Sequence, residues 1–541
     1  VIYMEKINGR KLSLIFIFIL ILLVIALLVG KFTYSYLGPT ISDDLEIQGE
    51  VTASGDTLIF TKGNNLSLSA TTDNFTTGGT NLTSTTNPKV KLVASTKTNQ
   101  ASATYYVGVL IKNNTYVYTT SGKTPELILT IKDEKGNNVS SGVDGLTYVT
   151  SGGVSGFDVT GKKGLFNIKM DYPISTTSSS AGTTHTWTFT LTFVNLGTDQ
   201  SGNENASMNV DIYLQKSKIP STLADVCTSG NNLATCITTL SNKSTSSLTN
   251  IYHHDSSLAN GAGDNSYRYA GANPNNFVCF GSDTSPCPTD NLYRIIGVFG
   301  ENYHGVTGKQ LVKLIKYDYM TTDELGTDGD YSQTYKEWGM DSTYKGTYGD
   351  GERIGVYFWN KDASTNTWST SLLNKTNLNT NFINYLGTTW ANKIATVTWK
   401  VGGNTWANIG AKTSSVAYTN EITNPVTTNT TDNATTYSAK IGLMYVSDYG
   451  FAASPDAWTL TMSSYNNTTA TNNNWMYMGL YEWTISRDAD RSDRAFDVDF
   501  GGNVSNFNVH GNYGVRASFN LESSVSYVSG SGSMSDPIVI N

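Results

Sequence analysis

The densest group of side chains able to make specific contacts lies between residues 487 and 513. It combines arginine, aspartate, asparagine, histidine and tyrosine, which offer charge-assisted hydrogen bonds and ring stacking. These are the contacts of a recognition surface, and no set of nucleophile, base and metal ligands is visible in the chain. The candidate ligand-binding residues are Arg487, Asp488, Asp490, Arg491, Asp493, Arg494, Asn503, Asn506, Asn508, His510, Asn512 and Tyr513.

The element that must position these residues is predicted to be a β-hairpin. Residues 495–500 alternate apolar and polar, a Gly-Gly-Asn turn follows, and residues 504–510 return. Because successive strand side chains point to opposite faces, we expect the candidate residues to lie mostly opposite the apolar ones. An ordinary polar outer face of a hairpin is the alternative. The apolar set expected to face the core is Phe496, Val498, Phe500, Val504, Phe507 and Val509.

Other groups of polar side chains indicate less chemistry. The acidic stretch 323–330, with Asp350 and Glu352, lacks EF-hand spacing and is typical of a solvated loop. Residues 488–499 mix arginines with aspartates, which predicts a surface salt-bridge network. The run His253-His254-Asp255 has no further ligand nearby, so solvated histidines are the simpler interpretation. We therefore expect no metal, no cofactor and no catalytic residue.

The four cysteines form two local pairs, Cys227 with Cys236 and Cys279 with Cys287. Neither pair has the two-residue spacing of a zinc knuckle or a redox motif, and exported chains favour disulfides. We expect both pairs to be disulfide-bonded in an extracytoplasmic compartment. Four buried free thiols are the alternative.

Residues 12–29 carry no charge and only one polar side chain, Ser13, which predicts a transmembrane helix. Lys6, Arg10 and Lys11 precede the run, so we expect the start to stay cytoplasmic and the rest to be exported. Residues 1–35 are thus a signal anchor or a cleaved signal peptide, and both remain open.

The whole-chain composition bounds the class of protein. At 541 residues the chain is long enough for several cores. Only 15% of residues are charged and the net charge is -8, which disfavours nucleic acid as a partner. Aromatic residues at 11% argue against disorder, and abundant Thr, Tyr and Gly favour strands joined by tight turns.

Composition along the chain divides it into parts. Strand-like runs through residues 40–215, such as 186–194, indicate an antiparallel sandwich. Residues 216–264 contain a Ser-, Asn- and Gly-rich stretch and are expected to form a mobile or extended connector carrying the first cysteine pair. Nine of the ten tryptophans follow Glu337, which marks a different core in residues 265–541.

The N-terminal part resembles exported camelysin-type and biofilm-fibre proteins of Gram-positive bacteria. The motifs are Thr33-Tyr34-Ser35-Tyr36, the run 58–61, and the strand that ends in Asn195-Leu-Gly-Thr-Asp-Gln200. The resemblance covers about residues 12–215 and implies a jelly-roll-like sandwich that self-associates or acts as a stalk. It does not carry metalloprotease activity here, since no His-Glu-x-x-His motif occurs.

Residues 265–541 resemble the C-type-lectin-like fold of formylglycine-generating enzymes, most closely an unassigned gut-bacterial branch. The motifs are 292–297, 368–379, Glu482-Trp483-Thr-Ile-Ser486 and Gly514-Val-Arg516. The resemblance implies an α+β domain with a small twisted sheet, two helices and long loops, and it assigns Trp483 and Arg516 to the scaffold. The fold class expected for this multidomain chain is a transmembrane helix, an all-β jelly-roll-like sandwich and a C-terminal α+β C-type-lectin-like domain.

Departures from that family limit what it implies. No cysteine follows Cys287, so the oxidase chemistry is unsupported, and the calcium signatures Glu-Pro-Asn and Trp-Asn-Asp are missing from the matching region. Residues 487–521 lack Lys, Glu, Gln, Trp and Met yet hold four of the eight arginines. This set matches substitution at the adenines of Asn codons and is similar to targets of diversity-generating retroelements, although chance is an alternative.

These observations lead to a functional hypothesis. We expect a cell-surface ligand-binding or adhesion protein that displays its C-terminal domain on a sandwich stalk. The expected partners are the membrane, through the N-terminal helix, and an extracellular protein or glycan, with self-association of the sandwich as a further option. A fibre or matrix subunit is the structural alternative, and an enzyme of the formylglycine-generating-enzyme fold is less favoured.

Overall fold

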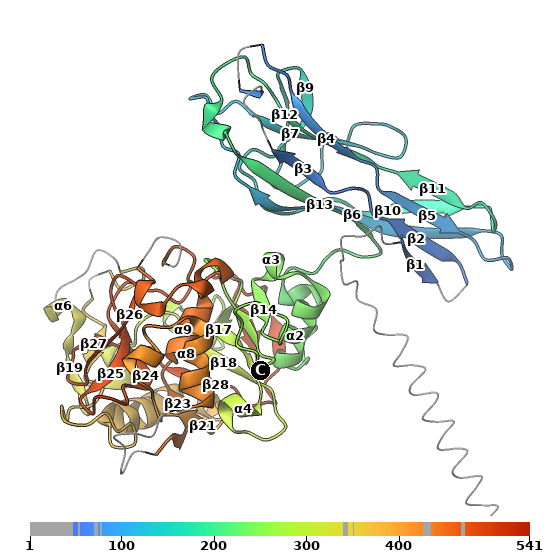
Figure 1. The fold of residues 1–541 in the computed structure, drawn as a ribbon. Coiled ribbons are helices and arrows are strands. Elements are labelled where there is room, and N and C mark those ends of the chain that lie inside the picture. Colours follow the sequence, from blue (N-terminus) through green and yellow to red (C-terminus); the bar gives the residue numbers. More distant parts are fainter. Residues whose placement is uncertain are drawn as a thin grey trace, which may run out of the picture. The chain divides into compact units, whose positions relative to one another are not determined.

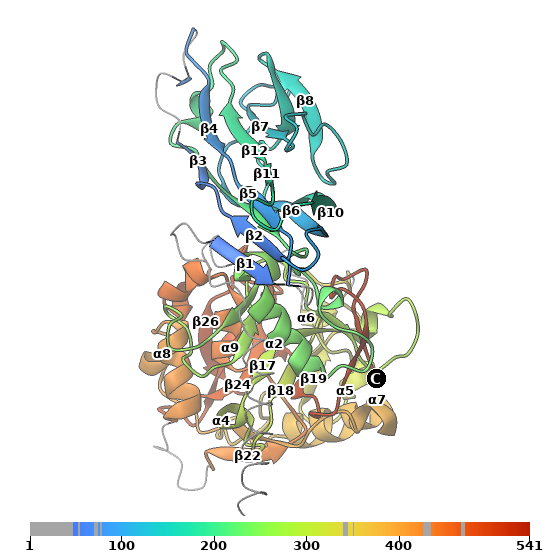
Figure 2. The ribbon, with the colours of Figure 1, turned by 90° about the vertical axis from the view of Figure 1, so that its right-hand side faces the viewer.

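The computed structural model describes residues 47–51, 55–69, 74–75, 78–338, 344–349, 351–425, 434–466 and 471–541. These residues belong to two compact units (Figures 1 and 2). The first consists of residues up to 108 with 115–160 and 168–216, and the second consists of 109–114, 161–167 and 217–541.

Three sheets account for most of the first unit. The first sheet has the order β1 (Ile47–Val51), β2 (Thr57–Thr61), β5 (Lys89–Val93), β11 (Thr183–Thr186). The second has the order β10 (Gly164–Thr176), β6 (Ala101–Asn114), β13 (Ser207–Gln215), β3 (Leu66–Ser69). The third has the order β4 (Leu82–Thr86), β12 (Thr188–Phe193), β7 (Leu127–Lys132), β9 (Val154–Asp158), β8 (Thr147–Ser151).

Period-two alternation builds the core of this unit, as the sequence predicts. In β12 the apolar side chains of Phe189, Leu191 and Phe193 are buried. Trp187, just before that strand, is also buried, and its indole Nε1 donates to the Tyr105 hydroxyl oxygen at 2.8 Å. The β-rich unit is consistent with the expected sandwich.

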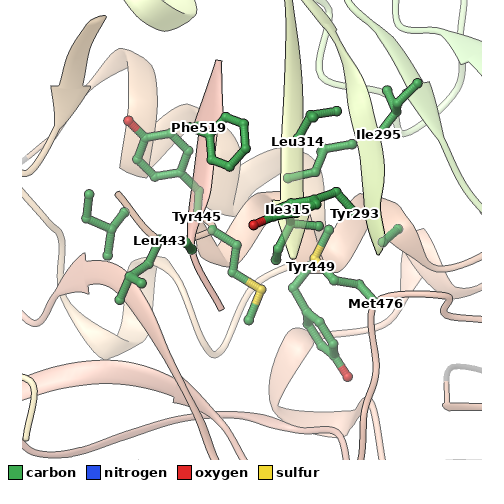
Figure 3. Packing of buried hydrophobic residues seen from close by; sticks show 14 of the residues in the cluster. Tyr293, Ile295, Leu314, Ile315, Leu443, Tyr445, Tyr449, Met476 and Phe519 are labelled. Atoms are coloured by element: carbon green, nitrogen blue, oxygen red, sulfur yellow. The ribbon is translucent and has the colours of Figure 1, made fainter. Parts of the chain in front are cut away.

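The larger sheet of the second unit has nine strands. Its main path is β23 (Ile441–Gly442), β28 (Ser518–Asn520), β18 (Leu311–Lys316), β17 (Leu292–Phe299), β16 (Phe277–Cys279), β30 (Ile538–Ile540), β29 (Tyr527–Ser529). β15 (Tyr267–Tyr269) joins β17 and pairs with β14 (Ile251–His253). Every residue of β17 and β18 is buried, and Figure 3 shows Tyr293, Leu314 and Phe519 in this packing.

A second sheet of six strands carries the candidate residues. Its order is β19 (Tyr331–Thr334), β20 (Gly355–Tyr357), β27 (Tyr513–Gly514), β24 (Glu482–Arg487), β25 (Arg494–Val498), β26 (Val504–Asn508). β21 (Val397–Lys400) and β22 (Thr436–Ala439) form a separate pair. The predicted hairpin is confirmed as β25 and β26.

The helices are short. The α-helices are α2 (Leu233–Lys243), α3 (Ser246–Thr249), α4 (Glu301–His304), α5 (Thr322–Leu325), α6 (Tyr335–Trp338), α7 (Ile383–Ala391), α8 (Ser414–Tyr418) and α9 (Val446–Ala452). The π-helical segments are η5 (Leu373–Phe382) and η7 (Thr419–Thr423). The 3-10 turns are η2 (Ser201–Asn203), η3 (Leu223–Asp225), η4 (Thr289–Asn291), η6 (Trp406–Asn408), η8 (Pro455–Thr459) and η9 (Met462–Ser464).

The expected fold class is wrong as stated. Within the described ranges no helix is long and apolar enough to span a membrane, and the predicted helix over residues 12–29 lies outside them. The predicted α+β domain is instead mostly β with few helices, because runs such as β17 and β18 are rich in the β-branched and aromatic residues that favour strands. The helices α4 and α5 also stop early at glycines with positive φ, Gly305 and Gly326.

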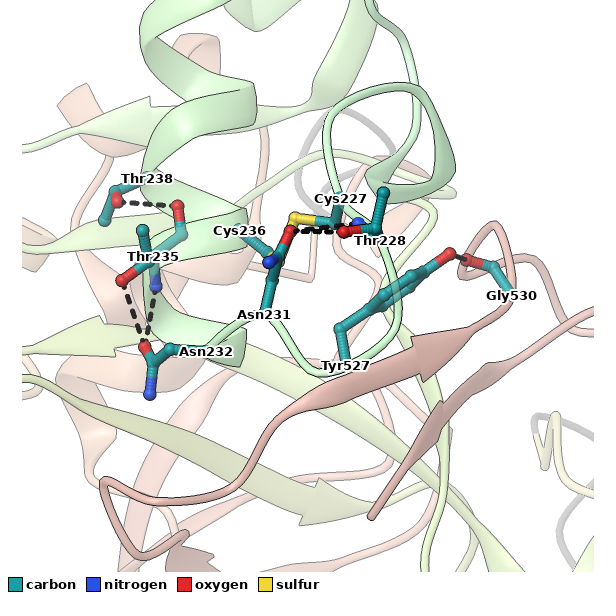
Figure 4. The surroundings of a disulfide bond; sticks show 9 residues. All are labelled: Cys227, Thr228, Asn231, Asn232, Thr235, Cys236, Thr238, Tyr527 and Gly530. Atoms are coloured by element: carbon teal, nitrogen blue, oxygen red, sulfur yellow. Dashed lines mark hydrogen bonds between the residues drawn. A yellow bond between two sulfur atoms is a disulfide. The ribbon is translucent and has the colours of Figure 1, made fainter.

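The connector is expected over residues 216–264, and of these residues 217–264 are part of the second unit. The helix α2 buries Leu233, Ile237 and Leu240, which share one helical face because they are four and three residues apart. The side chain of Asn232 caps this helix by accepting from the Thr235 N–H at 3.0 Å. Figure 4 shows this cap beside the first disulfide.

Both predicted disulfides are present. Cys227 bonds Cys236, and Cys279 bonds Cys287, with Cα atoms 5.8 Å apart in each pair. The first ties the loop before α2 to the helix itself (Figure 4). Two disulfides are typical of a chain in an oxidising, extracytoplasmic environment.

One buried ion pair connects the two large sheets. Arg516 lies between β27 and β28, and its Nε and Nη2 donate to the two carboxylate oxygens of Glu482 in β24 at 2.8 and 2.9 Å. Nη2 also donates to the Met476 carbonyl oxygen at 2.6 Å. Both side chains are buried, as the scaffold role expected for Arg516 requires.

The Arg516→Met variant is expected to lose about 3 to 5 kcal/mol of unfolding free energy, because it leaves the Glu482 carboxylate buried and unpaired. Urea unfolding of the full chain, followed by tryptophan fluorescence, measures this, since nine of the ten tryptophans lie after Glu337. Arg491→Met, which removes an exposed arginine paired with Asp493, is the matched control and is expected to cost at most about 1 kcal/mol. Equal losses in the two variants would contradict this role.

Candidate binding surface

Strand register decides which predicted site residues share a face. In the hairpin Arg494 pairs with Asn508 and Phe496 pairs with Asn506, while Phe507 pairs with Ala495. Directly paired residues of an antiparallel ladder lie on the same face. The candidate residues Arg494, Asn506 and Asn508 therefore share a face with the apolar Phe496, and the expected separation onto opposite faces is wrong.

Exposure divides the twelve candidate residues into three groups. Asp490, Arg491 and His510 are exposed. Arg487, Asp488 and Tyr513 are buried. The half-exposed residues are Asp493, Arg494, Asn503, Asn506, Asn508 and Asn512.

Hydrogen bonds hold the loop between β24 and β25 in one conformation. The Nδ2 group of Asn366 donates to the carbonyl oxygens of Asp488, Arg491 and Arg494 at 2.7 to 2.8 Å. The Asp488 carboxylate accepts from the Asp490 N–H at 2.9 Å and from the Asn506 side chain. Asp488 therefore serves the scaffold, which explains its burial.

The arginines of this segment already have partners within the second unit. Arg491 donates to both carboxylate oxygens of Asp493 at 3.1 and 3.2 Å. Arg494 donates to the Asn506 side-chain oxygen at 3.2 Å. Arg487 is buried, and its Nε donates to the Val401 carbonyl oxygen at 3.2 Å. None of the three arginines projects from the surface as an isolated charge.

The hairpin turn is held in the same way. Asp499 accepts from the backbone N–H and the side-chain Nδ2 of Asn503 at 2.9 and 3.1 Å. The Asn503 side-chain oxygen accepts from the Asn466 N–H at 2.9 Å. Gly502 has a φ of 93°, a backbone conformation that residues with a Cβ rarely adopt.

Four aromatic rings, which we call the ring row, lie along this part of the sheet. The order is Phe500, Tyr481, Tyr513 and Phe507, with successive centroids 5.4, 4.8 and 5.7 Å apart. Beneath the row lies the buried Trp483, whose ring centroid is 4.4 Å from the ring centroid of Tyr513. The indole Nε1 of Trp483 donates to the Tyr357 carbonyl oxygen at 2.8 Å. The hydrogen bond therefore holds the Trp483 ring in place beneath the row.

The two ends of the ring row are exposed. Phe500 is 42% exposed and Phe507 is 49% exposed, although strand alternation predicts both to face the core. Phe500 lies in the turn beyond the end of β25, where alternation no longer applies. Phe507 shares its face with Ala495, whereas the apolar neighbours Phe496 and Val504 occupy the opposite face. Sequence analysis missed both as surface residues, and only for Phe507 is a signal available, because it lies three residues after Val504 and so is out of phase with it.

His510 adds a further exposed ring. It stacks on Phe358 with centroids 3.8 Å apart and planes 10° from parallel. Its Nδ1 lies 3.1 Å from the Lys361 carbonyl oxygen, and its backbone N–H donates to the Asn508 side-chain oxygen at 2.9 Å. These contacts fix the imidazole at the surface.

Asp497 is a buried carboxyl next to the ring row. It pairs across the sheet with Trp483 and with Ser505, so the three side chains share a face. It is 1% exposed, and its Oδ1 has no hydrogen-bond partner in the part of the chain that the structure describes. Burial, reinforced by the charge of Asp499, raises the pKa of Asp497 well above its usual range, although Arg494 acts in the opposite direction.

Polar residues elsewhere that the sequence analysis considered, such as Asp330 and His254, make contacts inside the fold. Asp330, in the acidic stretch, accepts from the N–H groups of Lys361 and Leu373 at 3.0 and 2.7 Å. His254, expected to be solvated, is buried against Phe451, and burial lowers its pKa well below the usual value. Among the described residues there is no group of three or more His, Cys, Asp or Glu side chains that could hold a metal ion.

Comparison with known proteins adds no family: no family model, no curated protein and no solved structure matches the chain.

The Asp497→Asn variant is expected to be more stable than the wild type at pH 8, with a gap that narrows towards pH 4. Because the pKa of Asp497 is raised in the folded chain, its carboxyl stabilises the fold most at pH values below its pKa in the unfolded chain, about 3.9. This stabilisation is lost as the pH rises through the pKa of the folded chain. Thermal melts at both pH values measure the gap as a difference in melting temperature between the variant and the wild type, on the order of 2 °C per kcal/mol. Asp490→Asn, an exposed position in the same segment, is the control. A gap that widens towards pH 4 would contradict the assignment.

Proposed function

We propose that the chain is a bacterial cell-surface protein that binds an extracellular ligand through the second unit. The observation that carries this proposal is the pair of exposed phenylalanines, Phe500 and Phe507, at the ends of a ring row whose inner rings, Tyr481 and Tyr513, are half-buried and buried. Exposed aromatic rings that are held rigidly are typical contact residues of binding surfaces.

Rigidity of the surrounding loops supports the same role. The side chains of Asn366 and Asp499 hold the two turns that flank β25. A surface that is already ordered loses little conformational entropy when it binds. The exposed contact residues that we assign to the ligand are Asp490, Arg491, Phe500, Phe507 and His510.

The two disulfides support an extracytoplasmic location. The resemblance of residues 265–541 to C-type-lectin-like domains points to recognition as well. In this proposal the first unit separates the binding unit from the cell. Diversification of residues 487–521 remains part of the same hypothesis.

The alternative of a fibre subunit has less support. The long strand β10 lies at the edge of its sheet and would be a natural site for pairing with another copy. Its sequence contains Lys169, Asp171 and Pro173, and charges and proline on an edge strand oppose such pairing.

A binding screen of the immobilised full chain against extracellular proteins and polysaccharides tests the proposal. Phe507→Ala is expected to weaken binding of the selected ligand by about tenfold or more, because an aromatic anchor is lost. Tyr385→Ala, which removes an exposed aromatic ring from α7, is the matched control and is expected to bind as the wild type does. Tyr513→Ala is unsuitable, since Tyr513 is buried and its loss would disturb the scaffold. Equal binding by Phe507→Ala and the wild type would refute the surface.

A further inference from the structure

We infer that Lys313 and Asp448 condense into an amide, a covalent cross-link between β18 and α9 in the core of the second unit. The Lys313 Nζ atom lies 2.7 Å from Asp448 Oδ2, and both side chains are 0% exposed. The two residues are 135 positions apart in the sequence, so the bond closes a long loop of the chain. The inference goes beyond the proposed function, because it involves no ligand.

The surroundings of the pair keep water away from it. The Lys313 Nζ atom lies 4.4 to 4.9 Å from the ring centroids of Tyr445, Tyr303 and Trp399. Burial lowers the pKa of the Lys313 ammonium, although the Asp448 carboxylate acts in the opposite direction. Because a dry site disfavours charged groups, a proton can pass from the ammonium to the carboxylate across their hydrogen bond. The resulting neutral amine is a nucleophile and lies beside a carboxylic acid.

Two donors face the other carboxyl oxygen of Asp448. The Tyr303 hydroxyl donates to Oδ1 at 2.7 Å, and its own oxygen accepts from Lys313 Nζ at 2.6 Å. Arg268 Nη1 lies 3.6 Å from Oδ1 and has no hydrogen-bond partner in the part of the chain that the structure describes. Negative charge develops on this oxygen when the amine attacks the carboxyl carbon, and donors placed there stabilise that charge.

The condensation balances without an oxidant or a co-reactant. The Lys313 nitrogen attacks Cγ of Asp448, and the C–N bond forms. A proton moves from this nitrogen to Oδ2, the C–Oδ2 bond breaks, and Oδ2 leaves as water. One ammonium and one carboxylate thus become one secondary amide and one water molecule. Well-oriented groups reach effective concentrations on the order of 10⁵ M or more, and a water-excluding site opposes the reverse step.

The nearest remaining charge stays paired after the reaction. Arg268 Nη2 donates to Asp264 Oδ2 at 2.8 Å, so this arginine keeps a counter-ion once the Asp448 charge is gone. The condensation removes one positive and one negative charge together. It therefore leaves no uncompensated charge in the core, which would be costly.

The cross-link has a mechanical use in a protein displayed outside the cell. β18 is an inner strand of the nine-stranded sheet and pairs with β17 and β28. A bond from this strand to α9 holds residues 313–448 in one closed loop, which limits the conformations of the unfolded chain as a disulfide does. Force that separates the strands then cannot extend this segment.

Peptide mass mapping of the full chain, after reduction and alkylation, tests the inference. Trypsin does not cut after an acylated lysine, so the cross-linked chain yields residues 310–316 joined to residues 441–487, at the sum of their masses less one water. Without the bond, trypsin releases residues 310–313 and 441–487 separately. The joined product is expected in the wild type and absent from Lys313→Met and Asp448→Ala. Lys309→Met, which removes an exposed lysine just before β18, is the control and is expected to keep the cross-link in a longer peptide.

Two outcomes overturn the inference. Separate peptides alone in the wild-type digest would leave Lys313 and Asp448 as a buried ion pair. A joined product that persists in Lys313→Met would place the bond on another residue. The wild-type digest decides the question even where a variant fails to fold. Neither outcome concerns ligand binding, so the proposed function stands or fails separately.

Discussion

The architecture of the second unit depends on the buried ion pair between Arg516 and Glu482. Arg516 lies where the chain passes from β27 of the six-stranded sheet to β28 of the nine-stranded sheet, and Glu482 begins β24. A fork of two hydrogen bonds therefore fixes the point at which the sheets meet. Because both groups are removed from water, each is costly to bury without the other. Tyr513, which belongs to the ring row, and Trp483, which contacts it, lie close to these two residues in sequence.

This scaffold separates the residues that build the surface from those that contact solvent. The side chains of Asp488 and Asn503 form hydrogen bonds within the loop and the turn, and Arg487 is buried. Phe500 and Phe507 are left outside although they are apolar. Burying hydrogen-bonded polar groups while exposing aromatic rings gives a surface that is held in place from within and has apolar side chains outward.

Local patterns predicted much of the fold. Apolar alternation identified β12 and the hairpin of β25 and β26, and the short cysteine spacings predicted both disulfides. Predictions failed where distant residues decide the environment. His254 is buried because Phe451, almost two hundred residues later, packs on it. The segment around α2 joins the core through backbone bonds to the far end of the chain, such as Leu233 N–H to the Val525 carbonyl oxygen.

The sequence by itself determined the β-rich character, the hairpin, the cysteine pairs and the segment that carries the candidate surface, because these follow from periodicity and spacing within a few residues. Only the tertiary structure decided which side chains of that segment meet solvent. A one-residue difference in cross-strand register exchanges the two faces of a strand, and register depends on partners far away in the chain. Register alone is not enough, since Phe507 is exposed although Ala495, with which it pairs, is buried, and Phe496 is buried although its partner Asn506 is half-exposed.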